Sequence, residues 1–186
     1  FQDFNLRLAK KLTKKGIKVF YYVAPQAWVW RPSRVNELAK YTNHLFCILP
    51  FEKQWFSSRG VKEVSSVLHP VYKKIEEEGR WGHLTKDKRE VLLLPGSRNS
   101  EVLRTLPVFL KALSNVPHNL IISIVKTSSV KPEIYEAFGA RIDKSYDSSE
   151  LYHALENSKL CLAASGTATL SCALMGVPTI VGYKVS

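Results

Sequence analysis

Two segments of the chain place a glycine and a hydroxyl residue directly after an apolar run. They are residues 91–98, with the sequence VLLLPGSR, and residues 160–167, with the sequence LCLAASGT. Each apolar run predicts a buried strand, and each is followed by a helical pattern. Open α/β sheets bind ligands at the carboxyl ends of their strands, where the free N–H groups of a following helix favour phosphate. Both turns are therefore candidate phosphate sites.

The residue types at these turns fit a diphosphate. Glycine lets the backbone approach a ligand closely, and arginine offers a fork of donors to phosphate oxygens. One such turn alone would be an ordinary strand-to-helix connection with a hydroxyl cap, but two turns with an arginine favour the phosphate interpretation. The spacings GxGxxG and GxxxxGK are absent, which disfavours a dehydrogenase or a P-loop enzyme. The predicted phosphate-binding residues are Gly96, Ser97, Arg98, Ser165, Gly166, Thr167 and Ala168.

A second group of residues combines aromatic rings with positive charge. Trp28, Trp30, Arg31 and Arg34 lie between a predicted strand, residues 18–24, and a helical pattern that follows. Tryptophan beside arginine suits a lipid headgroup boundary or an anionic lipid substrate. The alternative is that at least one tryptophan fills the core.

The elements that must position these residues alternate between short apolar runs and helical patterns. Runs such as VLLL and LIISIV are apolar throughout, which is typical of parallel strands covered by helices on both faces. Residues 71–89 are charged, contain two glycines and show no core periodicity. The sequence therefore predicts two α/β units with parallel sheets, residues 1–72 and 90–186, joined by a linker at 73–89.

Composition narrows the function classes. The net charge is +11, and residues 1–50 hold nine Lys and Arg against two acids, a net of +7. Such a surface suits nucleic acid, an anionic membrane or an anionic substrate, and a plain solvated helix face is also open. The three cysteines stand singly in apolar runs, as reduced core thiols do. The chain begins without Met and ends on an apolar run, so we expect a fragment, incomplete at both ends.

Six blocks along nearly the whole chain form a recognisable series. They are DFN at 3–5, YVAPQAWVWR at 22–31, LPFE at 49–52, LLLPGSR at 92–98, SGTATL at 165–170 and GYK at 182–184. The Trp-x-Trp-Arg and Pro-Gly-Ser-Arg blocks are the most specific. In sequence and in order, the blocks resemble the motif series of the lipid-A-disaccharide synthases. The resemblance implies a glycosyltransferase of the GT-B type with two Rossmann-like domains. It further implies a cytoplasmic enzyme at the inner face of the inner membrane of Gram-negative bacteria.

The reaction that the resemblance implies is an inverting sugar transfer. UDP-2,3-diacylglucosamine donates its sugar to 2,3-diacylglucosamine 1-phosphate, which leaves UDP and a β-1,6-linked disaccharide 1-phosphate. Such a transfer needs a base near the acceptor hydroxyl and a stabilised leaving diphosphate. The matching block makes Asp3 the candidate base, with a helix N-cap as its alternative role. His69 is the second candidate, with a buried, satisfied histidine as its alternative.

The leaving diphosphate is expected to be met by arginine and helix ends. The sequence has no DxD pair, so we expect neither a metal ion nor a cofactor. Three positions depart from the family pattern: Gln2 for Pro, Leu68 for Gly, and Ser171 for the Glu that would hold the ribose.

Two other functions stay open at this stage. Another UDP-sugar-dependent GT-B enzyme, an N-acetylglucosamine transferase or epimerase, would share the phosphate turns but should lack the tryptophan loop. A non-catalytic, basic nucleic-acid-binding domain would explain the charge, but no RNA-binding signature is present, so we expect no nucleic-acid partner. The sequence does not determine the acyl chain length or the oligomeric state, for which a homodimer is one option.

Overall fold

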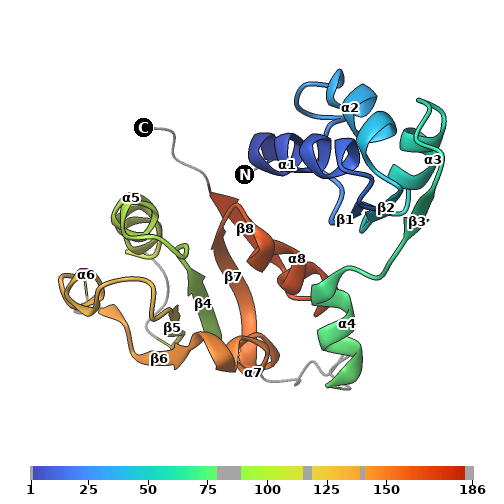
Figure 1. Ribbon diagram of the computed structural model, residues 1–186. Helices are drawn as coiled ribbons and strands as arrows, with labels where there is room; N and C mark the ends of the chain where they lie inside the picture. The colour runs from blue at the N-terminus through green and yellow to red at the C-terminus, as the bar shows by residue number, and fades with distance from the viewer. Residues whose placement is uncertain (1, 79–88, 115–118, 139–140, 183–186) are drawn as a thin grey trace. The chain divides into compact units, whose positions relative to one another are not determined.

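The computed structural model describes residues 2–78, 89–114, 119–138 and 141–182. The chain divides into two compact units, Phe1–Lys73 and Lys74–Ser186, and each has its own parallel sheet (Figure 1). The predicted fold class, α/β with two parallel-sheet units, is confirmed.

The first unit contains a three-stranded parallel sheet in the order β1-β2-β3. Its central strand alternates between half-buried and fully buried residues, as expected for a strand with one face on a core. The core beside this sheet contains the fully buried residues Leu38, Leu45 and Phe56. The elements are α1 (Gln2–Lys14), β1 (Phe20–Tyr22), α2 (Arg34–Tyr41), β2 (His44–Cys47), α3 (Glu52–Ser57) and β3 (Val64–Ser66).

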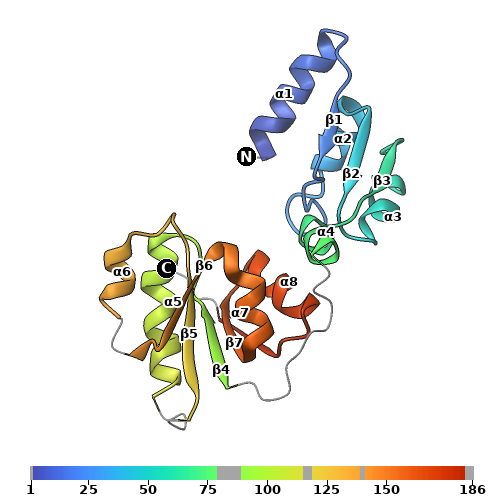
Figure 2. The ribbon, with the colours of Figure 1, turned by 90° about the horizontal axis from the view of Figure 1, so that it is seen from below.

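The second unit contains a five-stranded parallel sheet in the order β6-β5-β4-β7-β8. Its central strand β4 is buried along its whole length, because helices cover both faces. Figures 1 and 2 show α5 and α6 on one face of this sheet, and α7 and α8 on the other. The elements are β4 (Glu90–Leu94), α5 (Asn99–Ala112), β5 (Ile121–Lys126), α6 (Pro132–Glu136), β6 (Lys144–Asp147), a 3-10 turn (Ser148–Glu150), α7 (Leu151–Asn157), β7 (Ser158–Ala164), α8 (Thr167–Leu174) and β8 (Thr179–Gly182).

The strand order places a topological switch point between β4 and β7. From β4 the chain moves outward to β5 and β6, then returns to the other side of β4 to form β7 and β8. Right-handed crossovers then put the following helices on opposite faces. The crevice that opens at the carboxyl ends of two such strands is the usual ligand site of this architecture.

The structure differs from the sequence prediction in three places. Helix α6 and strand β6 were not predicted, because they lie in a polar stretch without clear periodicity. Residues 73–89 were predicted as a linker, but α4 (Pro70–Glu77) covers its first part and buries Ile75. Residues 79–88 of that linker lie outside the described residues. Ser33 stands at the N-cap position of α2, but its side chain makes no capping hydrogen bond.

Within the described part of the chain, no helix combines the length and the apolarity that crossing a bilayer requires. All three cysteines are free and buried.

Candidate functional site

A pocket of about 240 Å³ opens at the carboxyl edge of the second sheet. It lies at the switch point, between the ends of β4, β5 and β7 and the starts of the helices that follow. Six of the seven residues predicted to bind phosphate line it, so tertiary structure brings the two turns together. The lining residues are Leu94, Gly96, Ser97, Glu101, Val125, Thr127, Ser148, Leu151, Ala164, Ser165, Gly166, Thr167 and Ala168.

The turn after β4 is braced through its carbonyl groups. Thr105 Oγ1 donates a hydrogen bond to the carbonyl oxygen of Pro95 at 2.5 Å. Ser129 Oγ donates to the carbonyl oxygen of Ser97 at 2.8 Å. Because both carbonyl groups are held by side chains of the protein, the turn keeps the conformation that presents the Ser97 N–H group.

The Ser97 N–H group already has an anionic acceptor. It donates to Glu101 Oε2 at 2.9 Å. Gly96 has a φ of +123°, and a Cβ built on it would lie 2.4 Å from the side chain of Glu101. The sequence interpretation assigned this glycine to the close approach of a ligand, but the space beside it is filled by Glu101. Sequence reasoning missed Glu101, although an acid three residues after the helix N-cap is a known capping signal.

The turn after β7 leads directly into α8. A Cβ built on Gly166 would meet no atom within 4 Å, so the backbone there borders open space. Ser165 N–H is tied to the sheet by a hydrogen bond of 3.2 Å to the carbonyl oxygen of Gly182. The first N–H groups of a helix have no acceptor within the helix. At Thr167 and Ala168 they lie beside the pocket, where an anion could accept their hydrogen bonds.

Arg98 lines a neighbouring pocket instead. That pocket has a volume of about 280 Å³ and shares Glu101, Ala164 and Ser165 with the first. Arg104 lines it as well, and its Nε donates to the carbonyl oxygen of Ser100 at 2.8 Å. Sequence reasoning missed Arg104, because it lies within a helix and outside any of the motifs that the sequence offered.

Ser171 does not take part in either pocket. It lies within α8, and only 2% of its surface is exposed. The position where the family pattern has a glutamate therefore offers no side chain to the pocket in this structure.

In the first unit, Asp3 lies in the first turn of α1. Its Oδ1 accepts a hydrogen bond of 2.6 Å from Arg34 Nη2, and Arg31 Nη1 lies 3.7 Å away. The Arg34 side chain is 12% exposed, whereas that of Asp3 is 59% exposed. A largely buried guanidinium thus holds an exposed carboxylate in one orientation. The structure places Asp3 within helix α1, paired with Arg34, and not at the N-cap position.

The two tryptophans of the loop have different surroundings. Trp28 Nε1 donates to Glu52 Oε1 at 3.0 Å, and its ring packs edge-on against Phe51. Glu52 is only 1% exposed, and its second oxygen accepts the Leu49 N–H at 3.1 Å. Trp30, by contrast, is 72% exposed. One tryptophan is therefore anchored by a buried carboxylate, while the other extends into solvent.

The buried carboxylate affects a neighbouring thiol. Burial raises the pKa of Cys47 to about 12, and the negative charge of Glu52 adds to this shift. Cys47 therefore stays protonated at neutral pH and is a core thiol without nucleophilic character.

His69 caps a helix. Its Nδ1 accepts the Val71 N–H at 3.1 Å, at the start of α4. The imidazole is half-buried and engaged. His69 is thus satisfied, as its alternative role predicts, but it is half-buried and not fully buried.

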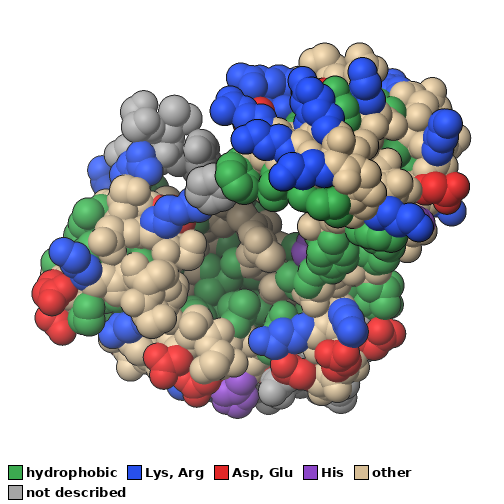
Figure 3. Space-filling view, in the orientation of Figure 1, with side chains coloured by type: hydrophobic (Ala, Val, Ile, Leu, Met, Phe, Trp, Pro, Cys, Tyr) green, Lys and Arg blue, Asp and Glu red, His purple; other side chains and the backbone are tan. Residues whose placement is uncertain are grey.

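Positive side chains gather on the outer face of α1. Figure 3 shows Lys and Arg over the part of the first unit where α1 and α2 lie. The exposed basic residues of α1 and the turn that follows it are Arg7, Lys10, Lys11, Lys14 and Lys15.

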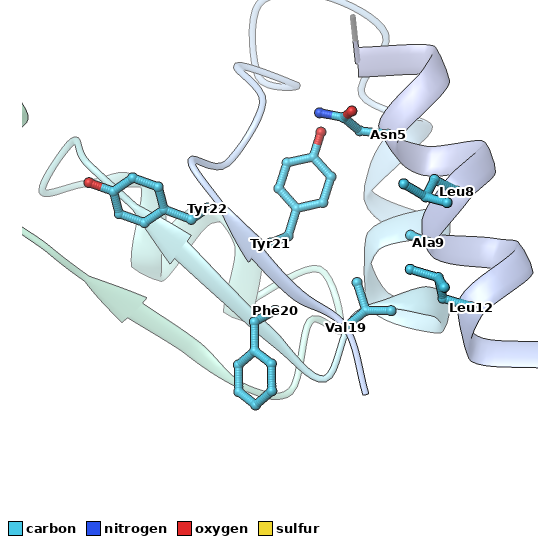
Figure 4. A pocket seen from close by; sticks show the side chains of 8 residues that line it. All are labelled: Asn5, Leu8, Ala9, Leu12, Val19, Phe20, Tyr21 and Tyr22. Atoms are coloured by element: carbon cyan, nitrogen blue, oxygen red, sulfur yellow. The ribbon is translucent and has the colours of Figure 1, made fainter. Parts of the chain in front are cut away.

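A groove of about 190 Å³ lies between α1 and β1. Leu8, Ala9 and Leu12 line it from the helix, and residues 19–22 line it from the strand (Figure 4). Tyr21 points toward α1, whereas Phe20 and Tyr22 point away from it (Figure 4). None of the lining residues of this groove is charged.

Among the residues that the structure describes, no group of three His, Cys, Asp or Glu side chains is placed to hold a metal ion.

Comparison with known proteins gives concordant matches over the whole chain. A family model described as lipid-A-disaccharide synthetase matches residues 1–186. A curated lipid-A-disaccharide synthase of Solibacter usitatus is 35% identical over 99% of this chain and 50% of its own length. Those of Syntrophus aciditrophicus and Francisella philomiragia are each 37% identical, over 51% and 52% of their lengths. The chain thus spans about half the length of these relatives.

A distant likeness exists to a solved structure, Anabaena HepE in complex with UDP and glucose. It is 12% identical, with a TM-score of 0.49 over 93% of this chain and 55% of that one.

The contact between Trp28 and Glu52 leads to a stability prediction. Glu52→Gln leaves one oxygen to serve two N–H donors, so one donor loses its partner. We expect the free energy of unfolding to fall by about 1–3 kcal/mol, measured by urea denaturation. Glu37→Gln removes an exposed acid of α2 and serves as the control. Equal stability of the two variants would contradict an anchoring role for Glu52.

Proposed function

The chain belongs to the lipid-A-disaccharide synthetase family, and on this basis we propose that the full-length protein is an inverting hexosyltransferase. It transfers 2,3-diacylglucosamine from UDP-2,3-diacylglucosamine to 2,3-diacylglucosamine 1-phosphate, which yields lipid A disaccharide 1-phosphate and UDP. The observation that carries the proposal is the meeting of two Gly/Ser turns in one pocket at the switch point. That pocket is where a nucleotide diphosphate fits the chemistry of the residues.

The two units have separate tasks in this proposal. Residues 1–72 belong to the acceptor-side domain, and residues 90–186 belong to the domain that binds the UDP-sugar. Together they are parts of the two Rossmann-like domains of a GT-B glycosyltransferase. The alternative, another UDP-sugar-dependent transferase or epimerase, would use a similar pocket. It is not favoured, because the family match and the Trp-x-Trp-Arg loop cover the acceptor side as well.

The diphosphate is held by dipoles and arginine. The N–H groups at the turns after β4 and β7 carry partial positive charge, and the start of α8 adds its helix dipole. Arg98, in the adjoining pocket, supplies a full positive charge as the bond to the diphosphate breaks. These groups stabilise the UDP that leaves, so this chemistry assigns no role to a metal ion.

Asp3 accepts the proton in this proposal. The acceptor hydroxyl attacks the anomeric carbon from the face opposite to UDP, so the configuration inverts. As the new C–O bond forms, the hydroxyl proton passes to a free lone pair of the Asp3 carboxylate. Arg34 binds one oxygen of this carboxylate and thereby orients the other toward its substrate. The neighbouring Arg31 lies 69% exposed and is available to the acceptor phosphate.

The protein associates with the anionic inner face of the inner membrane in this proposal. The basic side chains of α1 and the exposed Trp30 lie on the first unit, where an acylated acceptor would arrive. Anionic lipid attracts each basic residue near the surface, and tryptophan prefers the headgroup region.

Arg98→Ala in the full-length protein should weaken UDP binding by about 1.5–3 kcal/mol, because a hydrogen bond to a charged group is lost. Isothermal titration calorimetry measures this directly. Arg141→Ala removes an exposed arginine of the same unit that lines neither pocket, and its UDP affinity should equal that of the wild type. Unchanged affinity in Arg98→Ala, with the fold intact, would remove Arg98 from the site.

Asp3→Asn should lower turnover by about 10²–10⁴-fold, because the amide keeps the size but cannot accept the proton. UDP affinity and thermal stability should stay near wild type. Glu63→Gln, which neutralises an exposed acid of the same unit, should retain full turnover. Substantial turnover in Asp3→Asn would rule out the base role, whereas a loss of folding would indicate that the carboxylate serves mainly to pair with Arg34.

Binding to vesicles should depend on lipid charge. We expect stronger sedimentation with vesicles that contain anionic lipid than with neutral ones, and a decrease as salt is raised. Trp30→Ala combined with Arg31→Ala should reduce this binding, while Lys131→Ala in the second unit should not. Equal partitioning to both vesicle types would refute the electrostatic part of the proposal.

A further inference from the structure

Glu101 places a negative charge in the candidate phosphate pocket, where the proposed ligand is also an anion. Of the described residues that line the two pockets, it is the only acid, and it lines both. Its carboxylate accepts the Ser97 N–H at 2.9 Å and fills the space beside Gly96. A phosphate oxygen would seek the same donor in the same place.

The carboxylate and a bound diphosphate cannot share this position. Both are anions that accept hydrogen bonds, and the Ser97 N–H group can serve only one of them well. A carboxylate left beside a diphosphate would also repel it, by an amount that grows as water is excluded. The diphosphate therefore binds only when the Glu101 side chain turns away.

The adjoining pocket offers the displaced carboxylate a partner. Arg104 lies three residues after Glu101 on α5, and side chains at that spacing are neighbours on a helix surface. Both residues line the 280 Å³ pocket together with Arg98. By rotating its side chain, Glu101 can thus leave the Ser97 N–H group and pair with the guanidinium group of Arg104.

We propose that the Glu101 carboxylate competes with phosphate for the turn after β4. It occupies this turn when the pocket is empty and moves to Arg104 when a nucleotide diphosphate binds. This inference rests on the proposed nucleotide site. The physical consequence is a common penalty. Every ligand that places an anion at this turn must first displace Glu101, so its affinity falls by the same factor. A ligand without phosphate avoids this penalty.

The test compares charged and uncharged ligands in full-length protein. Glu101→Gln keeps the size of the side chain and its hydrogen bond to Ser97, but removes the charge. We expect UDP and inorganic pyrophosphate to bind about tenfold more tightly, equivalent to about 1.4 kcal/mol, while uridine affinity stays within about twofold. Glu136→Gln neutralises an exposed acid of α6, away from both pockets, and should change none of the three affinities.

Three results would overturn the inference in distinguishable ways. Unchanged UDP affinity in Glu101→Gln would make Glu101 a helix cap only. Weaker binding of both UDP and uridine would make it a direct ligand contact. If neither the wild type nor the variant binds UDP, the proposed nucleotide site fails, and the inference fails with it.

A double-mutant cycle tests whether the displaced Glu101 carboxylate pairs with Arg104. Arg104→Gln should weaken UDP binding in the wild type, because Glu101 loses its alternative partner, but should have little effect in Glu101→Gln. An equal loss in both backgrounds would mean that Arg104 contacts the phosphate itself, which would overturn the assigned role of Arg104.

Discussion

Strand β4 is hydrogen-bonded to β5 on one side and to β7 on the other, and all three strands run parallel. Their carboxyl ends therefore meet at one edge of the sheet, although the turns after β4 and β7 are far apart in the sequence. The reversal of strand order at β4 also sends α5 and α8 to opposite faces. The turns open toward each other across the crevice between these faces, and the candidate phosphate pocket is a consequence of this arrangement.

Two carboxylates of the first unit are each held by a different kind of partner. The buried Glu52 is satisfied by two N–H groups and fixes one side of the tryptophan loop. The exposed Asp3 is oriented by the largely buried Arg34. Because a buried charge without partners is very costly, the complete pairing of Glu52 makes its loop a well-defined element of the first unit. Asp3 keeps enough exposure to meet a substrate.

The turn after β4 is occupied by the carboxylate of Glu101, and this changes the role assigned to Gly96. A glycine at such a turn is commonly taken to admit a ligand, but the side chain that Gly96 admits here is that of Glu101. The open space at the second turn, beside Gly166, fits the usual explanation better. The two turns have similar sequences, but Gly96 leaves room for a protein side chain and Gly166 borders open space. A ligand would therefore have to displace a protein acceptor only at the first turn.

Local residue patterns were sufficient to predict most of the fold. Apolar runs and helical spacing predicted the parallel sheets and the strand-to-helix turns, because burial on both faces leaves a clear mark on strands such as β4. Helix α6 and strand β6 left no such mark. Strand β6 lies at the sheet edge with only Tyr146 buried, so its sequence is polar and its pairing with β5 defines it.

The candidate sites divide in the same way. The sequence by itself predicted the two turns and the tryptophan loop, because their residue types and spacing limit the chemistry, whereas Asp3 was predicted from its place in a block that resembles the family. Tertiary structure alone decided that the turns share a pocket, that Arg98 lies in the adjoining one, and that Ser171 faces inward. It also revealed Glu52, Glu101 and Arg104 as neighbours of the predicted residues. Such contacts depend on which strands pair and where each side chain points, and spacing along the chain does not encode either.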